Sequence, residues 1–409
     1  MGRAILYVTF DGVLQPLAFS QVVRVVVALA RRGFVYHLLS VERTQDLADR
    51  AKVAGVERRL ADAGIRWTIV GVDLVRSARR SAEAFARCVA AGHTIARNHE
   101  IVLTHARGYQ GAAVANVIRR ITTIPYLFDA RGFWIDEKTD WFSNAAAYAA
   151  GKVAERCLYA DARAVVTLTE LHARDVVDGA FGTKDARVVV TIPTCADYDE
   201  FQVAPERPIQ SAGSGGVPPE VQCRLAGRIV LGIVGALNRS YLPEATLSLV
   251  KHACELRQDF HLLVLTQQRT EYEALLTAHG LTAESFTVAS AKHEDMPTWL
   301  AWVDWGLLVL ADTIAKRGSM PTKLAEFFAA GVRPLAYGCN SEMTDWVRRA
   351  GSGIVLDAVT EPALRAAALD LSSATDDIEA RRHAREVTRP HFSLASGVDR
   401  YLRLLDGIL

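Results

Sequence analysis

Residues 318–331 read GSMPTKLAEFFAAG, and the residue types at the start of this segment suit anion binding. Pro321 belongs in the first turn of a helix and Gly331 belongs just after the last turn, so the segment predicts a helix. The first N–H groups of a helix lack intrahelical partners, and the helix dipole is positive at that end. Two hydroxyls and one ammonium group add to this site, those of Ser319, Thr322 and Lys323. The pattern predicts a pyrophosphate cradle, and the alternative is an ordinary capped amphipathic helix.

Glu326 extends this prediction toward a nucleoside. It lies four residues after Thr322 and three after Lys323, so the three side chains share one face of the predicted helix. A carboxylate at this position can accept hydrogen bonds from the two hydroxyls of a ribose.

A second group of polar residues follows the apolar run RIVLGIVG. Gly235 ends this predicted strand, and Asn238 and Arg239 lie in the next loop. An arginine there could bind a phosphate through two hydrogen bonds, and a surface arginine without a partner is the alternative.

The first strand of the chain leads into a loop that begins DGVLQP. Asp11, Gly12 and Gln15 lie between this strand and a predicted helix start, where N–H groups are free. The loop predicts contact with a ligand, or it is simply a turn between a strand and a helix.

His105 ends another predicted strand, IVLTHA, and Arg107 follows two residues later. A histidine at a strand end can hydrogen-bond a sugar hydroxyl or transfer a proton. A structural role for a single histidine is the alternative.

The segment YLFDARGFWIDE combines charged and aromatic residues after a third strand of this half. Asp129 and Arg131 flank the strand end, Phe133 and Trp134 offer flat apolar surfaces, and Asp136 follows. Aromatic faces beside carboxylates suit a polyhydroxylated ligand, and an ion pair that fixes the loop is the alternative.

The elements that position these residues form a regular series. Short apolar strands alternate with amphipathic helices along nearly the whole chain, which predicts parallel sheets covered by helices on both faces. Ligands of such sheets bind at the carboxyl ends of the strands. The motifs GxGxxG and GxxxxGK[ST] do not occur, which argues against a dinucleotide dehydrogenase and a P-loop ATPase.

The series breaks once, so we expect two α/β domains. Residues 1–201 form the first Rossmann-like domain, and residues 202–227, rich in Pro, Gly and Ser, form a linker. Residues 228–390 form the second domain, and residues 391–409 form a last helix.

Composition narrows the class of protein further. The net charge of +1 over 409 residues gives no indication of a nucleic-acid partner. The six cysteines are scattered, without the spacing of a zinc site, which is typical of a reducing cytoplasm. We expect a cytoplasmic protein, and peripheral contact with the inner face of a membrane stays open.

Taken together, these residues resemble the family-4 glycosyltransferases, which are retaining enzymes of the GT-B fold. The resemblance rests on the order and spacing of DGVLQPLAFSQ, HARGY, FDARGFWIDE, IPTCAD and SMPTKLAEFFAAG. It implies two facing Rossmann-like domains, with the last helix crossing back to the first domain. It also implies a metal-independent, hexosyltransferase-type enzyme, with the acceptor in the first domain and a nucleotide sugar in the second.

The resemblance also implies roles for the candidate residues. The nucleotide sugar is a substrate, so no cofactor is expected, and UDP is favoured over GDP. The expected catalytic residues are His105, Asp129 and Arg131. The expected donor-binding residues are Gly12, Gly235, Asn238, Arg239, Ser319, Pro321, Thr322, Lys323 and Glu326. The expected acceptor-binding residues are Asp11, Gln15, Arg107, Phe133, Trp134 and Asp136.

Two positions depart from the family pattern. The family often has a second glutamate where this chain has Gly318, and many members have an arginine where this chain has Ala236. The compensating cation could be any of Arg239, Lys316, Arg317 and Lys323.

These departures keep two other functions open. One is a sugar-nucleotide epimerase or hydrolase of the same fold. The other is a degenerate protein that binds a nucleotide or a partner without turnover. The acceptor is a carbohydrate, a lipid-linked molecule or a small molecule, and the sequence does not choose among them.

Overall fold

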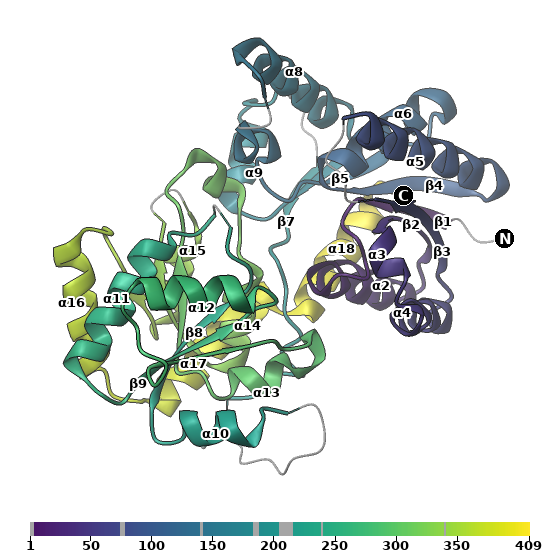
Figure 1. Cartoon of the computed structure of the whole chain (residues 1–409). Coiled ribbons are helices and arrows are strands. Elements are labelled where there is room, and N and C mark those ends of the chain that lie inside the picture. Colours follow the sequence, from purple (N-terminus) through teal and green to yellow (C-terminus); the bar gives the residue numbers. More distant parts are fainter. Residues whose placement is uncertain are drawn as a thin grey trace. The chain divides into compact units, whose positions relative to one another are not determined.

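The structure is a computed structural model that describes residues 4–73, 78–139, 142–182, 188–203, 216–238, 240–338 and 341–409. The chain forms two compact units (Figure 1). Unit 1 contains Met1–Pro193, Arg317–Ser319 and Gly397–Leu409. Unit 2 contains Thr194–Lys316 and Met320–Ser396.

Unit 1 is built on a seven-stranded sheet in the order β3-β2-β1-β4-β5-β6-β7, and every neighbouring pair is parallel. The chain therefore crosses over between β1 and β4, where the strand order reverses. The strands are β1 (Ala4–Thr9), β2 (Val35–Arg43), β3 (Arg66–Val72), β4 (Ile101–Arg107), β5 (Tyr126–Asp129), β6 (Ala164–Thr167) and β7 (Val188–Thr191).

Helices cover both faces of this sheet. The helices are α1 (Pro16–Ala18), the π-helix η1 (Phe19–Val23), α2 (Arg24–Arg31), α3 (Thr44–Leu47), α4 (Arg50–Asp62), α5 (Ala78–Asn98), α6 (Gly108–Thr122), α7 (Trp134–Glu137), α8 (Ala145–Asp161) and α9 (Glu170–Val177). The last helix of the chain, α18 (Leu394–Ile408), joins unit 1 from Gly397 onward and lies beside α2, where Arg32 pairs with Asp399 at 3.7 Å.

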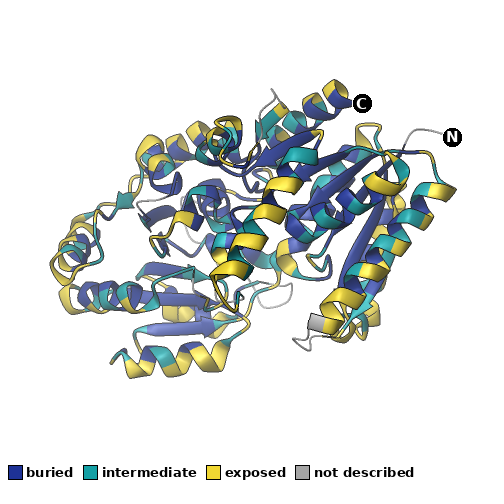
Figure 2. Cartoon of the chain, turned by 90° about the horizontal axis from the view of Figure 1, so that it is seen from above, coloured by how far each residue is buried: buried dark blue, intermediate teal, exposed yellow. Residues whose placement is uncertain are grey.

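Apolar side chains from the strands and helices form the core of unit 1. Strand β1 is buried along its full length, as expected for a central strand covered on both faces (Figure 2). The outer faces of the helices are exposed, so the burial pattern follows the amphipathic periodicity of their sequences.

Unit 2 repeats the same plan with a six-stranded sheet in the order β10-β9-β8-β11-β12-β13, again parallel throughout. Its strands are β8 (Ile229–Val234), β9 (Phe260–Leu265), β10 (Phe286–Ala289), β11 (Trp305–Val309), β12 (Arg333–Tyr337) and β13 (Ile354–Val355). Its helices are α10 (Pro219–Leu225), α11 (Pro243–Leu256), α12 (Arg269–Ala278), η3 (His293–Asp295), α13 (Met296–Leu300), α14 (Thr322–Ala330), α15 (Met343–Ala350), α16 (Glu361–Ser373) and α17 (Ile378–Phe392); η4 (Ile314–Gly318) ends in unit 1.

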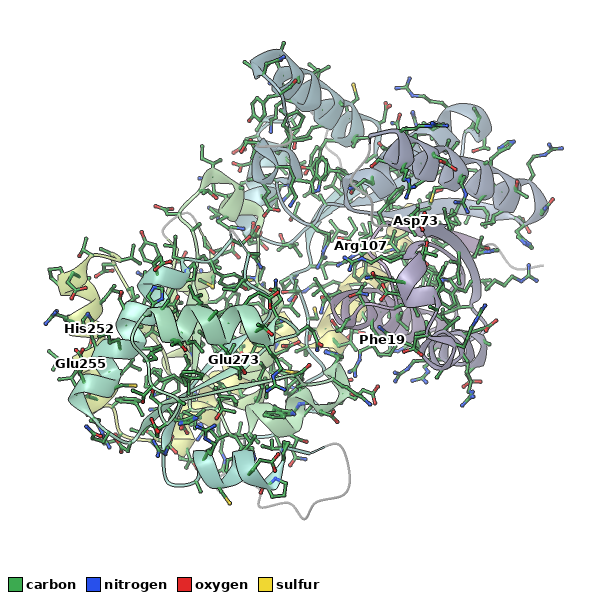
Figure 3. The ribbon with its side chains drawn as sticks, viewed as in Figure 1. Phe19, Asp73, Arg107, His252, Glu255 and Glu273 are labelled. Atoms are coloured by element: carbon green, nitrogen blue, oxygen red, sulfur yellow. The ribbon has the colours of Figure 1, made fainter. Side chains whose placement is uncertain are left out.

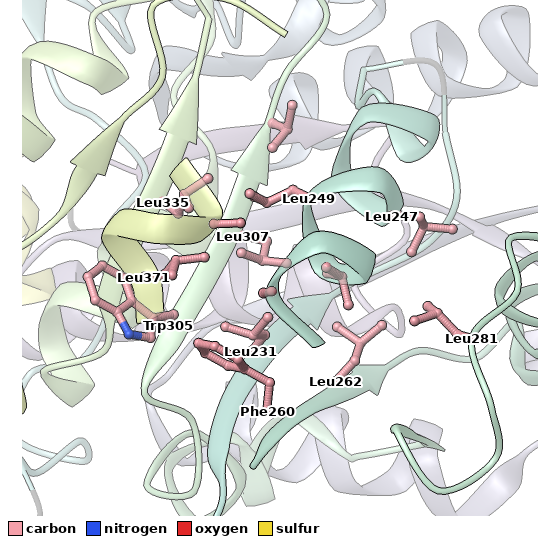
Figure 4. Packing of buried hydrophobic residues seen from close by; sticks show 14 of the residues in the cluster. Leu231, Leu247, Leu249, Phe260, Leu262, Leu281, Trp305, Leu307, Leu335 and Leu371 are labelled. Carbon is pink, nitrogen blue, oxygen red and sulfur yellow. The ribbon is translucent and has the colours of Figure 1, made fainter. Parts of the chain in front are cut away.

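The core of unit 2 packs leucines of the strands against α11 and α16. Leu231 and Leu307 come from neighbouring strands, and Leu371 comes from α16 (Figure 4). Trp305 closes one side of this cluster, and the guanidinium group of Arg333 lies 4.1 Å from the centre of its ring. This cation–π contact covers the indole ring at the end of the core.

The fold class predicted from the sequence is confirmed. Two parallel α/β sheets are present, and the last helix belongs with the first unit. The short helices that were not predicted include α7, α9, which begins after the N-cap Thr169, and α10, which lies inside the range expected to be a linker. Residues 204–215 of that range lie outside the described residues.

In the part of the chain that the structure describes, no helix combines the length and the apolar character needed to cross a membrane.

Candidate functional site

The carboxyl ends of β1, β4 and β5 bring together the charged residues of unit 1. The parallel register places Thr9 beside Arg107, and Arg107 beside Asp129. Asp129 is fully buried and accepts hydrogen bonds from Arg131 Nη1 at 3.1 Å and from Arg107 Nη1 at 3.4 Å. Arg107 is labelled in Figure 3. The structure thus brings these residues together at one edge of the sheet.

Tyr401 of α18 completes this cluster. Its hydroxyl donates a hydrogen bond to Asp129 Oδ2 at 3.2 Å, across 272 positions of sequence. Burial by itself would raise the pKa of Asp129, but the guanidinium groups of Arg131 and Arg107 hold this pKa below its ordinary value. Asp129 is therefore a permanent carboxylate that orients two arginines, and it is poorly suited to act as a general acid.

His105 lies next to this cluster and packs between two tyrosines, whose rings are tilted by 47° and 43° to the imidazole. Its ring centre is 4.4 Å from that of Tyr7 and 5.4 Å from that of Tyr401. The ring is fully buried, and neither ring nitrogen has a hydrogen-bond partner among the described residues. Burial lowers the pKa of His105 to about 4, so the imidazole is neutral at neutral pH. The environment suits a neutral hydrogen-bonding group rather than a cation.

The loop Asp11–Gln15 is attached to the same edge of the sheet. Asp11 accepts a hydrogen bond from Arg107 Nε at 2.8 Å. Gln15 donates from Nε2 to Asp46 at 2.6 Å. Between them, Glu42 of β2 accepts hydrogen bonds from the backbone N–H groups of Val13 and Leu14. Glu42 was not among the residues expected from the sequence.

The aromatic residues of the FDARGFW segment take different positions. Phe133 is buried, with its ring 4.4 Å from that of His172, so it belongs to the core of unit 1. Trp134 is half-buried and stacks on Tyr109 at 6.0 Å. Asp136 is held by Tyr148 and Lys152 at 2.7 and 2.9 Å.

A buried chain of hydrogen bonds supports this segment from behind. Glu155 accepts from the Tyr109 hydroxyl at 2.7 Å, and the hydroxyls of Tyr109 and Tyr159 are 3.3 Å apart. The Tyr159 hydroxyl lies 2.8 Å from His172 Nε2. Burial lowers the pKa of His172 to about 3. The chain thus links α6, α8 and α9 through side chains that the sequence did not single out.

Segment Arg317–Ser319, which belongs to unit 1, explains why one family glutamate is missing. A Cβ atom added at Gly318 would lie 3.2 Å from Gly132 Cα, from Phe133 N and from His172 Nδ1. These distances are shorter than ordinary Cβ contacts, so a side chain at this position requires its neighbours to shift by a few tenths of an ångström. Two of the three neighbouring atoms belong to the backbone, so the close approach to Gly132 and Phe133 disfavours a glutamate at position 318.

Side chains of unit 1 also hold this segment in place. Thr169 Oγ1 donates to the carbonyl oxygen of Arg317 at 2.5 Å, and Arg317 pairs with Asp175 at 3.1 Å. Ser319 Oγ donates to Glu137 Oε1 at 3.1 Å. The hydroxyl expected to face a diphosphate therefore has a carboxylate partner in this structure.

In unit 2, the end of β8 meets the start of α14. Gly235 has a φ of +122°, which favours glycine, and a Cβ added there would lie 3.9 Å from Lys323 Cε. Helix α14 begins at Thr322, so Pro321 is its N-cap. The sequence predicted Pro321 inside the first turn, and the structure places it one residue before that turn. Lys323 thus lies over a glycine turn at the carboxyl end of a central strand, as the pyrophosphate prediction requires.

Glu326 follows one helical turn later and is buried. It lies close enough to Tyr241 that its charge, added to the effect of burial, raises the pKa of that phenol to about 12. Lys316 is also buried and donates to Ser240 Oγ at 2.9 Å. A small apolar cavity of about 40 Å³ lies beside this loop and is lined in part by Tyr241 and Tyr272.

The loop after Gly235 contains the remaining donor candidates. Asn238 is exposed, and its Oδ1 accepts a hydrogen bond from the backbone N–H of Ser240 at 2.9 Å. Arg239, the expected phosphate-binding arginine, lies outside the described residues.

Comparison with protein families identifies part of this architecture. Residues 20–194 match the family described as glycosyl transferase 4-like domain. This segment, which is less than half of the chain, resembles a glycosyl transferase 4-like domain. The resemblance to the family-4 glycosyltransferases is thereby confirmed for this part of the chain.

Solved structures share the fold over the full length of the chain. A structure of Anabaena HepE in complex with UDP-glucose has 14% identity and a TM-score of 0.71, and covers 99% of this chain and 100% of its own. Sucrose-phosphate synthase from Thermosynechococcus elongatus has 12% identity and a TM-score of 0.71, and covers 100% and 99%. Both chains are similar in fold, which is the GT-B fold of glycosyltransferases. No curated protein sequence matches the chain.

In unit 1, the structure brings together four candidates at one site, namely Asp11, Arg107, Asp129 and Arg131. His105 lies beside them, whereas Phe133 is a core residue. In unit 2, Gly235 and Lys323 are brought together. The sequence analysis missed Glu42, although a carboxylate at the end of an apolar strand could have indicated it. It could not have found Tyr401, because the partner of Tyr401, Asp129, is 272 positions away in the sequence.

Proposed function

We propose that the chain is a retaining glycosyltransferase that moves a sugar from a nucleotide sugar, with UDP favoured, to a hydroxyl of an acceptor. The observation that carries the proposal is the position of Lys323 over the Gly235 turn, at the carboxyl end of β8. A glycine turn and a helix start at a strand end suit a diphosphate. The complexes of Anabaena HepE with UDP and with UDP-glucose, which share the fold, support a UDP-sugar donor.

In this proposal, unit 2 neutralises the leaving nucleotide. Lys323 supplies an ammonium group to the diphosphate, and Glu326 accepts hydrogen bonds from the ribose. Lys316, buried against Ser240, is the best-placed candidate to compensate for the arginine replaced by Ala236. Because the leaving group carries the developing negative charge, fixed cations there lower the barrier without covalent catalysis.

Unit 1 would receive the acceptor and the transferred sugar. His105, Asp129 and Arg131 remain the candidate catalytic residues. The neutral imidazole of His105 suits hydrogen bonding to a sugar hydroxyl, and Asp129 fixes the two guanidinium groups. The acceptor hydroxyl would attack on the face from which the nucleotide leaves, so the anomeric configuration is retained, and no metal is required.

Nucleotide binding tests the donor site directly. We expect UDP or GDP to raise the melting temperature, because a ligand that binds only the native state stabilises it. Glu326→Ala should reduce this shift. Lys323→Ala should reduce it for nucleoside diphosphates but not for uridine, since uridine has no phosphate. Unchanged shifts in both variants would remove the donor-site assignment.

Turnover tests the roles of unit 1. His105→Ala should reduce sugar transfer more than nucleotide binding, and a fully active variant would make His105 a structural residue. Activity should persist in the presence of a chelator. Loss of activity that added Mg²⁺ restores would contradict the metal-independent mechanism.

A second candidate function is a sugar-nucleotide epimerase. A protein of Listeria monocytogenes assigned as a UDP-N-acetylglucosamine 2-epimerase has the same fold, with 12% identity and a TM-score of 0.62. Incubation with UDP-sugars alone separates the two functions: epimerisation or rapid cleavage without an acceptor favours the alternative. Binding without any conversion across a broad acceptor panel would instead indicate a degenerate nucleotide-binding protein.

A further inference from the structure

The loop Asp11–Gln15 is held by side chains on both sides. Arg107 binds Asp11 at one end, and Asp46 binds Gln15 at the other, at 2.8 and 2.6 Å. The middle of the loop is attached to Glu42, whose Oε1 and Oε2 lie 2.8 Å from Val13 N and 3.2 Å from Leu14 N. Side chains of unit 1 therefore hold the loop at both ends and in its middle.

Burial raises the pKa of Glu42, and the hydrogen bonds that it accepts oppose this effect and favour the ionised carboxylate. Ser40 Oγ lies 2.6 Å from Glu42 Oε1, and Trp67 Nε1 donates to the same Ser40 oxygen at 2.8 Å. Since Ser40 accepts from Trp67, its own proton is directed to Glu42. All three groups around Glu42 therefore donate, and an ionised carboxylate accepts such bonds without needing an acceptor for a proton of its own.

Gly12 permits this arrangement. A Cβ atom added at Gly12 would lie 3.0 Å from Glu42 Oε2, so a side chain there would require the carboxylate or the loop to shift by a few tenths of an ångström. The backbone N–H groups of Val13 and Leu14 both point to one carboxylate. Loops bind phosphate with the same arrangement of consecutive N–H groups. In this protein the carboxylate of Glu42 accepts these two hydrogen bonds.

We propose that Glu42 is a positioning residue that stands where a ligand phosphate would bind, so that the loop Asp11–Gln15 contacts an uncharged part of the substrate. Glu42 is fully buried, and Asp46 adds a second carboxylate at one end of the loop, whereas Asp11 at the other end is paired with Arg107. Like charges this close disfavour a second anion. The inference rests on the proposed function in one respect, namely that this loop contacts a substrate.

Hydrogen exchange of the loop tests the proposal without turnover. In the wild-type chain, mass spectrometry should show the peptide that covers residues 11–15 protected in the absence of ligand. Glu42→Ala should lose this protection and lower the melting temperature by about 4–8 °C, because two buried N–H groups lose their acceptor. Acetate should restore both protection and melting temperature, since it fits the space left by the carboxylate, and neutral acetamide should restore neither.

Glu42→Gln is the matched control for size. It fills the same space without the charge, so it should lose protection and show no response to acetate. A Glu42→Ala variant that keeps wild-type protection, or that responds equally to acetate and acetamide, would overturn the positioning role.

The second measurement addresses the ligand. Inorganic phosphate, UDP and glucose 6-phosphate should each leave the protection of this peptide unchanged in the wild-type chain. A gain of protection with any of the three would overturn the claim that the loop contacts an uncharged group. Because the melting-temperature shift with UDP reports on unit 2 separately, failure of this proposal is distinguishable from failure of the donor site.

Discussion

The two sheets have the same strand order around their crossover points, but different side chains lie at the two points. In unit 1, the β1/β4 crossover holds buried charges that pair with one another, with Asp129 between Arg107 and Arg131. In unit 2, the β8/β11 crossover has a glycine turn with Lys323 above it and a small cavity nearby. The ion pairs of unit 1 hold their side chains in fixed positions, so that site is preorganised. In unit 2, the ammonium group of Lys323 beside the Gly235 turn is suited to bind an anion.

The largest expected effect breaks the ion pairs of unit 1. Asp129→Ala removes the acceptor shared by two arginines and Tyr401, so the free energy of unfolding should fall by about 3–5 kcal/mol. Urea denaturation of the full chain measures this. Asp73→Ala, at an exposed surface pair, is the control and should cost less than about 1 kcal/mol. Equal effects of the two variants would mean that the cluster is not a preorganised unit.

A smaller effect comes from pH, to which buried histidines of unit 1 contribute together with His261 of unit 2, whose pKa burial lowers to about 4. The pKa values of His105 and His172 in unit 1 are lowered to about 4 and about 3, against about 6.5 in the unfolded chain. The native state therefore binds fewer protons than the unfolded state, so the free energy of unfolding decreases as pH falls below about 6.5. Each histidine should contribute a loss of about 2 kcal/mol between pH 7 and pH 5.

Calorimetry over this pH range measures the loss. His105→Gln should make the decline less steep, because one of the buried histidines with a lowered pKa no longer titrates, while His37, His172 and His261 still do. A decline as steep as that of the wild-type chain would place the effect elsewhere in the molecule.

Restoring the family glutamate should fail. Gly318→Glu forces a side chain toward Gly132, Phe133 and His172, so we expect a loss of about 1–3 kcal/mol of stability and no gain in donor affinity. Gly318→Ala should show a smaller loss of the same sign. Thermal unfolding with and without UDP-glucose measures both, and tighter donor binding in Gly318→Glu would show that the segment rearranges to admit the side chain.

The smallest expected effect sharpens the assignment in unit 2. Lys323→Ala should weaken UDP binding about tenfold, or about 1.4 kcal/mol, with little change in the stability of the free protein. Lys292→Ala removes an exposed lysine of the same unit and is the matched control. Isothermal titration calorimetry measures both, and equal affinities in the two variants would mean that the cation over the Gly235 turn does not bind the diphosphate.

The sequence by itself determined the sheets and the ends of their strands. Continuous apolar runs such as that of β1 form central strands because both of their faces are covered, and Gly331 ends α14 because it adopts the left-handed conformation with a φ of +69°. These are local effects, which the order of residues records directly. The parallel arrangement then placed Arg107 and Asp129 at the same edge.

The tertiary structure alone decided which side chains complete each site. Tyr401 reaches Asp129 because the last helix packs on unit 1, and Gly318 is constrained by a backbone approach to Gly132. Glu42 occupies the N–H groups of the loop that the sequence had assigned to a ligand. Such contacts join residues far apart in the chain, and they depend on burial and packing distances, which periodicity and spacing do not encode.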